Sequence, residues 1–142
     1  WIGLFSPSNR FADFERLVVI SGEADKAQTD RLEREWKNRN VRFANNLPLP
    51  RLGAVLERSI FMGHDSGISH LAAAAGANCI LLFGPTDPGV WAPKNDNVQI
   101  LRAPNARLSD LRIKQVEAAF AAAAAAKPFP LRTADTTAFQ SG

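Results

Sequence analysis

Short apolar runs alternate with segments of helical periodicity along most of this chain, and that alternation constrains the fold most strongly. The runs predicted as strands are 2–5, 17–21, 41–44, 60–62, 79–83 and 98–101. Helical patterns separate them, at 29–38, after Pro50, at 68–75 and from a Ser109-Asp110 cap into the Ala118–Ala126 tract. In the pattern after Pro50 we expect Leu52, Val55 and Leu56 to face the core, and we expect Gly76 to stop the helix at 68–75. Strands that are apolar throughout are buried on both faces, which is typical of parallel sheets covered by helices. We therefore expect an α/β fold with a doubly wound, Rossmann-like parallel sheet.

Length and composition indicate one folded domain. The chain has 142 residues, of which 46% are hydrophobic, enough for a substantial core. We predict that residues 1–127 form this domain and that 128–142 are a flexible tail, because Lys127-Pro128 ends the last helical pattern. The link between Phe5 and Leu17 is short for a crossover helix. The chain also lacks a starting Met, so we expect it to begin within a longer protein.

Charge and cysteine content exclude several classes of function. The net charge of +3 is scattered rather than clustered, so we expect no nucleic-acid partner, although an anionic membrane surface stays open as a partner. Cys79 is the single cysteine and is interpreted as a core residue. The set His64, Asp65 and His70 lacks the spacing of a closed metal site, so no metal is expected.

Two polar turns interrupt the apolar pattern at the ends of neighbouring predicted strands. Gly63-His64-Asp65-Ser66-Gly67 precedes a helix, and Gly84-Pro85-Thr86-Asp87-Pro88 follows the next strand. In open α/β sheets, ligands bind beyond the carboxyl ends of the strands. A helix start offers unpaired N–H groups and a favourable dipole, so the first turn is a candidate anion site to which Ser66 adds a hydroxyl.

Each of these features also has a purely structural interpretation. Asp65 or Ser66 could cap the helix, His70 could be a hydrogen-bonded core histidine, and the Gly84 turn could only reverse the chain. We expect Trp91 to pack under the second turn. No Gly-x-Gly-x-x-Gly follows a predicted strand, so the dinucleotide fingerprint is absent.

At these residues the chain resembles family 9 glycosyltransferases, the ADP-heptose:lipopolysaccharide heptosyltransferases. The resemblance is carried by Asp-Ser-Gly-Ile-Ser-His-Leu-Ala-Ala-Ala at 65–74, by Gly76, and by Leu-Phe-Gly-Pro-Thr-Asp-Pro at 82–88. Weaker similarity extends from about Val18 to Phe120. The resemblance implies the C-terminal, donor-binding half of a GT-B fold, with an acceptor-binding half that this chain lacks.

The resemblance also implies a role for individual residues. The donor's diphosphate and sugar would be bound by Asp65, Ser66, Gly67 and His70, and by the second turn, Gly84, Pro85, Thr86 and Asp87. The nucleoside would contact Glu23 and Leu47. Where the family has a Lys after the first strand, this chain has Ser6, Ser8 and Arg10, so Arg10 is the candidate cation near the diphosphate. The catalytic base would lie in the missing half.

The function implied is an inverting, metal-independent transfer of a sugar, heptose from ADP-heptose, to a lipopolysaccharide core acceptor. No cofactor is expected beyond the ADP-sugar, which is the donor substrate. The implied location is cytoplasmic, at the inner face of the cytoplasmic membrane if the protein makes peripheral contact there. The alternative from another functional class is a nucleotide-sugar binding module without transferase activity.

Overall fold

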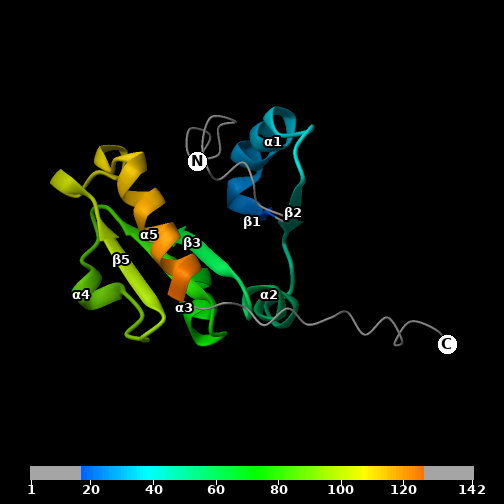
Figure 1. The fold of residues 1–142 in the computed structure, drawn as a ribbon. Coiled ribbons are helices and arrows are strands. Elements are labelled where there is room, and N and C mark those ends of the chain that lie inside the picture. Colours follow the sequence, from blue (N-terminus) through cyan, green and yellow to red (C-terminus); the bar gives the residue numbers. More distant parts are fainter. Residues whose placement is uncertain (1–16, 127–142) are drawn as a thin grey trace.

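The computed structural model describes residues 17–126 and shows strands alternating with helices (Figure 1). The strands are β1 (Leu17–Ser21), β2 (Val41–Asn45), β3 (Ile60–His64), β4 (Asn78–Phe83) and β5 (Val98–Arg102). The helices are α1 (Lys26–Glu35), α2 (Leu49–Leu56), α3 (Gly67–Ala74), α4 (Pro88–Trp91) and α5 (Ile113–Ala126). Three short 3-10 turns are η2 (Glu23–Asp25), η3 (Pro104–Ala106) and η4 (Leu108–Asp110). The predicted strand at 2–5, the link that follows it and the predicted tail at 128–142 lie outside the described residues.

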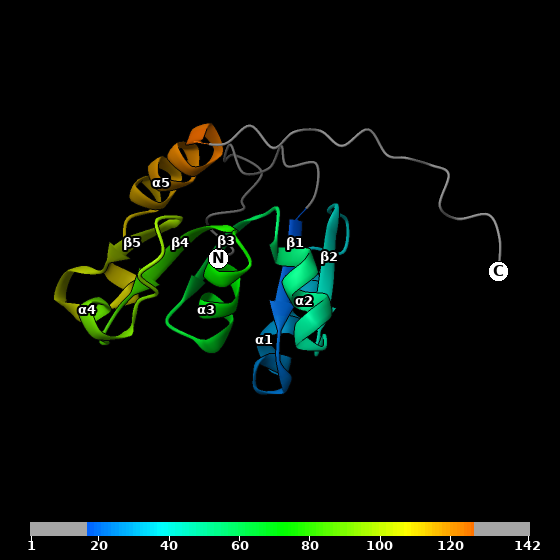
Figure 2. The same cartoon turned by 90° about the horizontal axis from the view of Figure 1, so that it is seen from below.

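Every strand pair in the described range is parallel, as the alternation predicts. The hydrogen-bonded strands form two groups, β1-β2 and β3-β4-β5. In the first group Leu17 pairs with Val41, and in the second Ile60 pairs with Asn78 and Cys79 with Val98. Figure 2 shows α3 and α5 on opposite sides of β3-β4-β5, which is the doubly wound arrangement.

Two apolar clusters cover the two faces and cross from one strand group to the other. The first joins α2, α3 and β4 through buried residues such as Leu56, Ala72 and Phe83, and Ile20 of β1 packs against it. The second joins α1 to α5 through Trp36 and Val116, with side chains from every strand packed against it. Side chains along a strand alternate between faces, so neighbouring β4 residues enter different clusters. Packing therefore unites the two strand groups into one α/β domain.

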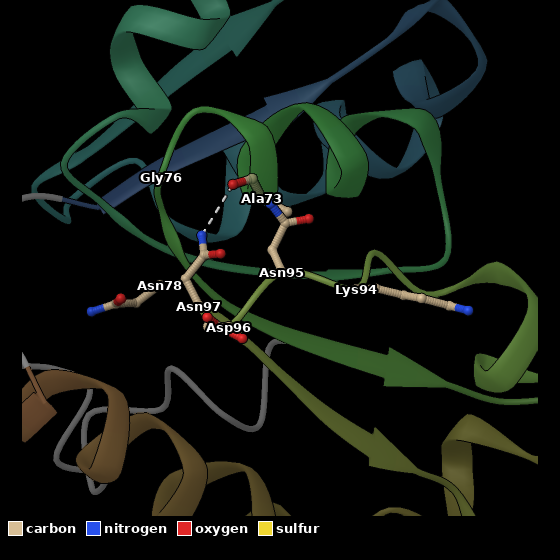
Figure 3. A pocket seen from close by; sticks show the side chains of 7 residues that line it. All are labelled: Ala73, Gly76, Asn78, Lys94, Asn95, Asp96 and Asn97. Atoms are coloured by element: carbon tan, nitrogen blue, oxygen red, sulfur yellow. Dashed lines mark hydrogen bonds between the residues drawn. The ribbon is translucent and has the colours of Figure 1, made fainter.

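The C-terminal end of α3 is fixed by a Schellman motif and by one asparagine. Gly76 has a φ of +84°, its N–H donates to Ala73 O at 3.2 Å, and Ala77 N donates to Ala72 O at 3.1 Å. Asn97, just before β5, donates through Nδ2 to Ala73 O at 3.1 Å (Figure 3). The same amide nitrogen donates to Ala77 O at 2.6 Å. Asn97 therefore anchors the end of α3 to the start of β5.

Some local predictions are wrong. Val55 was expected to face the core with Leu52 and Leu56, but it is 42% exposed because it lies off the buried stripe of α2. Ser109 and Asp110 belong to the separate turn η4 rather than capping the last helix. The α5 helix begins at Ile113, and Gln115 Oε1 accepts a hydrogen bond from Arg112 N at 3.1 Å. No helix within residues 17–126 is both long and apolar enough to cross a membrane.

Candidate functional site

Strand register brings the two polar turns together at the carboxyl edge of the sheet. His64, the last residue of β3, is the register partner of Leu82 in β4. Asp65 follows His64 directly, and Gly84 comes two residues after Leu82. The turns at 65–67 and 84–87 therefore leave adjacent parallel strands at the same edge. This adjacency is the geometry that a shared ligand would require.

The start of α3 is left without a side-chain cap. Ser66 is extended at φ −164°, ψ 163°, and its side chain accepts no bond from the first turn. Its Oγ instead lies 3.2 Å from Ser69 Oγ, and the buried Ser69 hydroxyl donates to the His64 carbonyl. A Cβ added at Gly67 would meet no atom within 4 Å, so there is open space beside that backbone. The first N–H groups of α3 are thus available to an anion.

The second turn is packed from the β5 side. Gly84 is buried, and a Cβ built on it would lie 3.1 Å from Leu108 Cγ and 3.4 Å from Ala106 O. Asp87 caps α4, because its carboxylate accepts a hydrogen bond from Gly89 N at 2.9 Å. Pro85 is exposed and Thr86 half-buried. Thr86 is therefore partly accessible in this turn, whereas the Asp87 carboxylate already accepts a hydrogen bond from the helix.

The two histidines differ in environment. His70 is exposed on α3, so the interpretation of it as a core histidine is wrong. Partial loss of hydration lowers the pKa of His64, and the Asp25 carboxylate acts in the opposite direction.

The residues predicted to contact a nucleoside follow the other strand pair. Ser21 pairs with Asn45 in register, and Ser21 Oγ donates to Asn45 Oδ1 at 2.8 Å. Glu23 lies exposed in η2, and Leu47 lies half-buried before α2. Leu47 packs against the apolar cluster that also holds Ile68 of α3. Packing therefore connects the Leu47 region with the first turn. Arg10, the candidate cation, lies outside the described residues.

Two surface recesses contain none of the predicted site residues. One, of about 670 Å³, lies where α3 ends and β4 begins and is lined by residues including Asn78, Lys94 and Asn97 (Figure 3). The other, of about 560 Å³, lies at the start of α5 between Pro104 and Arg112. The α3 recess is at the opposite end of that helix from Gly67. Of its polar lining residues, Asn97 caps α3 and Asn78 donates to Ala123 O of α5 at 3.3 Å, so this recess is distinct from the carboxyl-edge site.

Sequence reasoning overlooked one residue of the site and misplaced another. Ser69 was not singled out, although a Ser three residues after Ser66 is the spacing that places both hydroxyls on one helix face. Trp91 was expected to pack under the second turn, but it is 57% exposed on the last position of α4. The prediction for Trp91 was wrong because Ala92, and not Trp91, enters the core. Among residues 17–126 there is no group of three or more His, Cys, Asp or Glu side chains that could hold a metal ion.

Taken together, the fold and the carboxyl-edge turns define a Rossmann-like α/β domain in which α3 begins without a side-chain cap. Comparison with known proteins then identifies its family. A model of glycosyltransferase family 9 (heptosyltransferase) matches residues 10–120, and the chain belongs to this family. The fold is the C-terminal half of a GT-B architecture.

Individual relatives agree with this assignment. The chain is 34% identical over 87 residues to lipopolysaccharide heptosyltransferase 3 of Escherichia coli K12, covering 58% of this chain and 25% of the relative. The structure of E. coli heptosyltransferase WaaC with ADP matches with a TM-score of 0.68 and 28% identity, over 86% of this chain and 37% of that one. The WaaC structure with ADP-2-deoxy-2-fluoro heptose gives a TM-score of 0.64 at 27% identity, over 85% and 35% of the two chains. This chain thus spans well under half of the proteins it matches.

Proposed function

We propose that this chain is the donor-binding half of a glycosyltransferase that moves heptose from ADP-heptose to a lipopolysaccharide core acceptor. The observation that carries the proposal is the uncapped start of α3 beside the Gly84 turn. Family membership and the solved relatives in complex with ADP and an ADP-heptose analogue support this choice of donor. The same proposal includes the lipopolysaccharide acceptor, the adenine base of the donor and a location at the inner face of the cytoplasmic membrane.

The proposed transfer inverts the anomeric centre and needs no metal. A base in the other half of the protein takes the proton of an acceptor hydroxyl, and the oxygen forms a bond to the anomeric carbon. The bond from that carbon to the diphosphate breaks, its electron pair stays on the diphosphate, and ADP leaves. Negative charge grows on the leaving group, so donors already oriented toward it lower the barrier.

Each described residue has a defined part in that stabilisation. The N–H groups of Gly67 and Ile68 and the Ser66 hydroxyl face the departing diphosphate. Thr86 adds a hydroxyl from the neighbouring turn, and His70 lies one helical turn beyond Gly67. Asp65 accepts hydrogen bonds from sugar hydroxyls, while Glu23 and Leu47 contact the nucleoside. The α3 donors are held in place by Ser69 below and by Asn97 at the far helix end.

Binding of nucleoside diphosphates to the full-length protein tests the proposal. We expect ADP and ADP-sugars to stabilise it more than the UDP and GDP compounds. At about 100 times Kd, the added unfolding free energy should be about 2.7 kcal/mol. Equal or absent thermal shifts across the three bases would contradict the proposed donor. Binding of ADP-heptose without transfer of heptose to a lipopolysaccharide acceptor and without release of ADP would instead indicate a binding module.

Substitution of Gly67 tests the site itself. Gly67→Val should abolish ADP binding, because the added side chain enters the space in which the diphosphate would approach the backbone. The fold should persist, since a Cβ there meets nothing within 4 Å. Gly53→Val is the matched control, because Gly53 is also helical and equally open but lies in α2. Normal ADP affinity in Gly67→Val would remove α3 from the donor site.

A further inference from the structure

The proposed diphosphate site contains no Lys or Arg among its described residues. Its turns carry two carboxylates, Asp65 and Asp87, which would repel a diphosphate. His64 contributes little positive charge at neutral pH, because loss of hydration lowers its pKa. A metal-independent diphosphate site usually needs a cationic side chain to offset the ligand's charge. Arg10, the candidate cation, lies outside the described residues, so a cation from the described part of the chain would act in addition to it.

Arg107 is the cation that the backbone brings to the second turn. The atoms closest to a Cβ built on Gly84 are Leu108 Cγ at 3.1 Å and Ala106 O at 3.4 Å. Arg107 is the residue between these two contacts. The segment leaves the sheet at the same edge, because Ala103 N donates to Phe83 O at 2.8 Å just beyond the end of the β4–β5 ladder.

The backbone before Arg107 is held in an unfavourable conformation. Asn105 and Ala106 have φ values of +53° and +56°, in the left-handed region that residues with a Cβ seldom adopt. Such strain persists only where the surrounding structure imposes it, and it is found preferentially at functional sites. Here Arg107 N donates to Pro104 O at 3.2 Å, which closes the turn and sets the direction in which the Arg107 side chain leaves it.

The Arg107 side chain is available to a ligand. It is 73% exposed, and its Nε lies 3.8 Å from Asp110 Oδ2. An ion pair this long and this exposed contributes little to stability and is readily exchanged for a better partner. A guanidinium can form two parallel hydrogen bonds with phosphate oxygens. A diphosphate also carries more negative charge than the single carboxylate of Asp110, so it is the stronger partner for Arg107.

We propose that Arg107 binds the donor's diphosphate from the β5 side of the Gly84 turn and so selects for nucleoside diphosphates over nucleosides. This inference rests on the proposed function. The diphosphate would then be held between the N–H groups of α3 on one side and the Arg107 guanidinium on the other. Arg112 serves as a comparison, because it is a nearby arginine that lines the recess at the start of α5.

Calorimetry on the full-length protein with ADP and adenosine tests this assignment. Arg107→Ala should weaken ADP binding at least tenfold and leave adenosine affinity unchanged. The dependence of ADP affinity on salt should also decrease, because one cation–phosphate contact is lost. Arg107→Lys should recover part of the ADP affinity, and Arg112→Ala should bind both ligands as the wild type does.

The outcomes separate failure of this inference from failure of the proposed function. If the wild type binds ADP better than adenosine and Arg107→Ala binds ADP equally well, the assignment of Arg107 is wrong. It is also wrong if Arg107→Ala weakens adenosine and ADP to the same extent, because the residue would then act through the fold. If the wild type binds neither ligand, the proposed function itself fails.

Discussion

Removal of the Asn97 side chain should release the end of α3 that lies opposite the candidate site. Asn97→Ala deletes two hydrogen bonds, to Ala73 O at 3.1 Å and to Ala77 O at 2.6 Å. Both alanines are buried, at 2% and 0% exposure, and each carbonyl has one other, longer contact, from Gly76 N at 3.2 Å and from Cys79 Sγ at 3.4 Å respectively. A net hydrogen bond contributes about 0.5–1.5 kcal/mol, and an orphaned buried acceptor costs about 1–3 kcal/mol.

The magnitude is limited by the recess around Asn97. This recess of about 670 Å³ opens to solvent beside the asparagine, so water can reach the carbonyls once the amide is removed (Figure 3). We therefore expect Asn97→Ala to lower the unfolding free energy by about 2 kcal/mol. This value corresponds to the loss of two net hydrogen bonds, and not to the larger cost of leaving two buried carbonyls without any partner. Denaturant unfolding followed by tryptophan fluorescence measures it, because Trp36 is buried in the core.

Two further variants make the experiment decisive. Asn95 lines the same recess but makes no side-chain hydrogen bond to any described residue, so Asn95→Ala should change the unfolding free energy by less than about 0.5 kcal/mol. Asn97→Asp keeps the shape but places a carboxylate against two carbonyls and the negative end of α3. Its deficit should shrink as the pH falls and the acid becomes a donor. Equal stabilities of Asn97→Ala and Asn95→Ala would refute the reasoning.

Two predictions follow from titrating groups. Burial raises the pKa of Cys79 to about 11, so alkylation of this single cysteine at pH 8 should be about a hundredfold slower in the native protein than in denaturant; equal rates would contradict its burial. The pKa of His64 is lowered in the folded state, so the unfolded chain binds the proton more readily and stability is lost as the pH falls below about 6.5. His64→Gln should therefore lose less stability than the wild type between pH 7 and 5, and parallel acid profiles would show that His64 does not contribute.

Strand positions could be predicted from the sequence because their signals are local. Apolar runs identified β1 and β4, and Gly84 marked the turn at which β4 gives way to the candidate site. The predicted end of β3 was wrong, because Gly63 pairs with Leu81 inside the ladder and the strand continues to His64. Gly76 was predicted to stop α3, and its φ of +84° gives the physical reason. At such positions one residue type is strongly preferred by the backbone, so the pattern alone carries the information.

The predictions that were wrong depend on contacts between residues that are distant in the sequence. Val55 and Trp91 are apolar, but the sequence does not reveal that no described element covers them. Ser109-Asp110 has the composition of a helix cap, yet the segment is folded into η4 and contacts Gly84 through Leu108. Arg107 became a candidate only through that contact, which joins residues more than twenty positions apart in the chain. Such long-range juxtapositions require coordinates.

The two parts of the proposed donor site are connected by packing rather than by a continuous ladder of hydrogen bonds. Glu23 and Leu47 follow β1 and β2, whereas Gly67 and Gly84 follow β3 and β4, and no ladder joins these strand groups within residues 17–126. Leu47 packs against the same apolar cluster as Ile68, and that cluster crosses from one group to the other. The relative position of nucleoside and diphosphate would therefore be set by side-chain volumes beneath α2 and α3. Core substitutions there should alter donor affinity even though they touch no ligand, because close-packed interiors transmit small displacements.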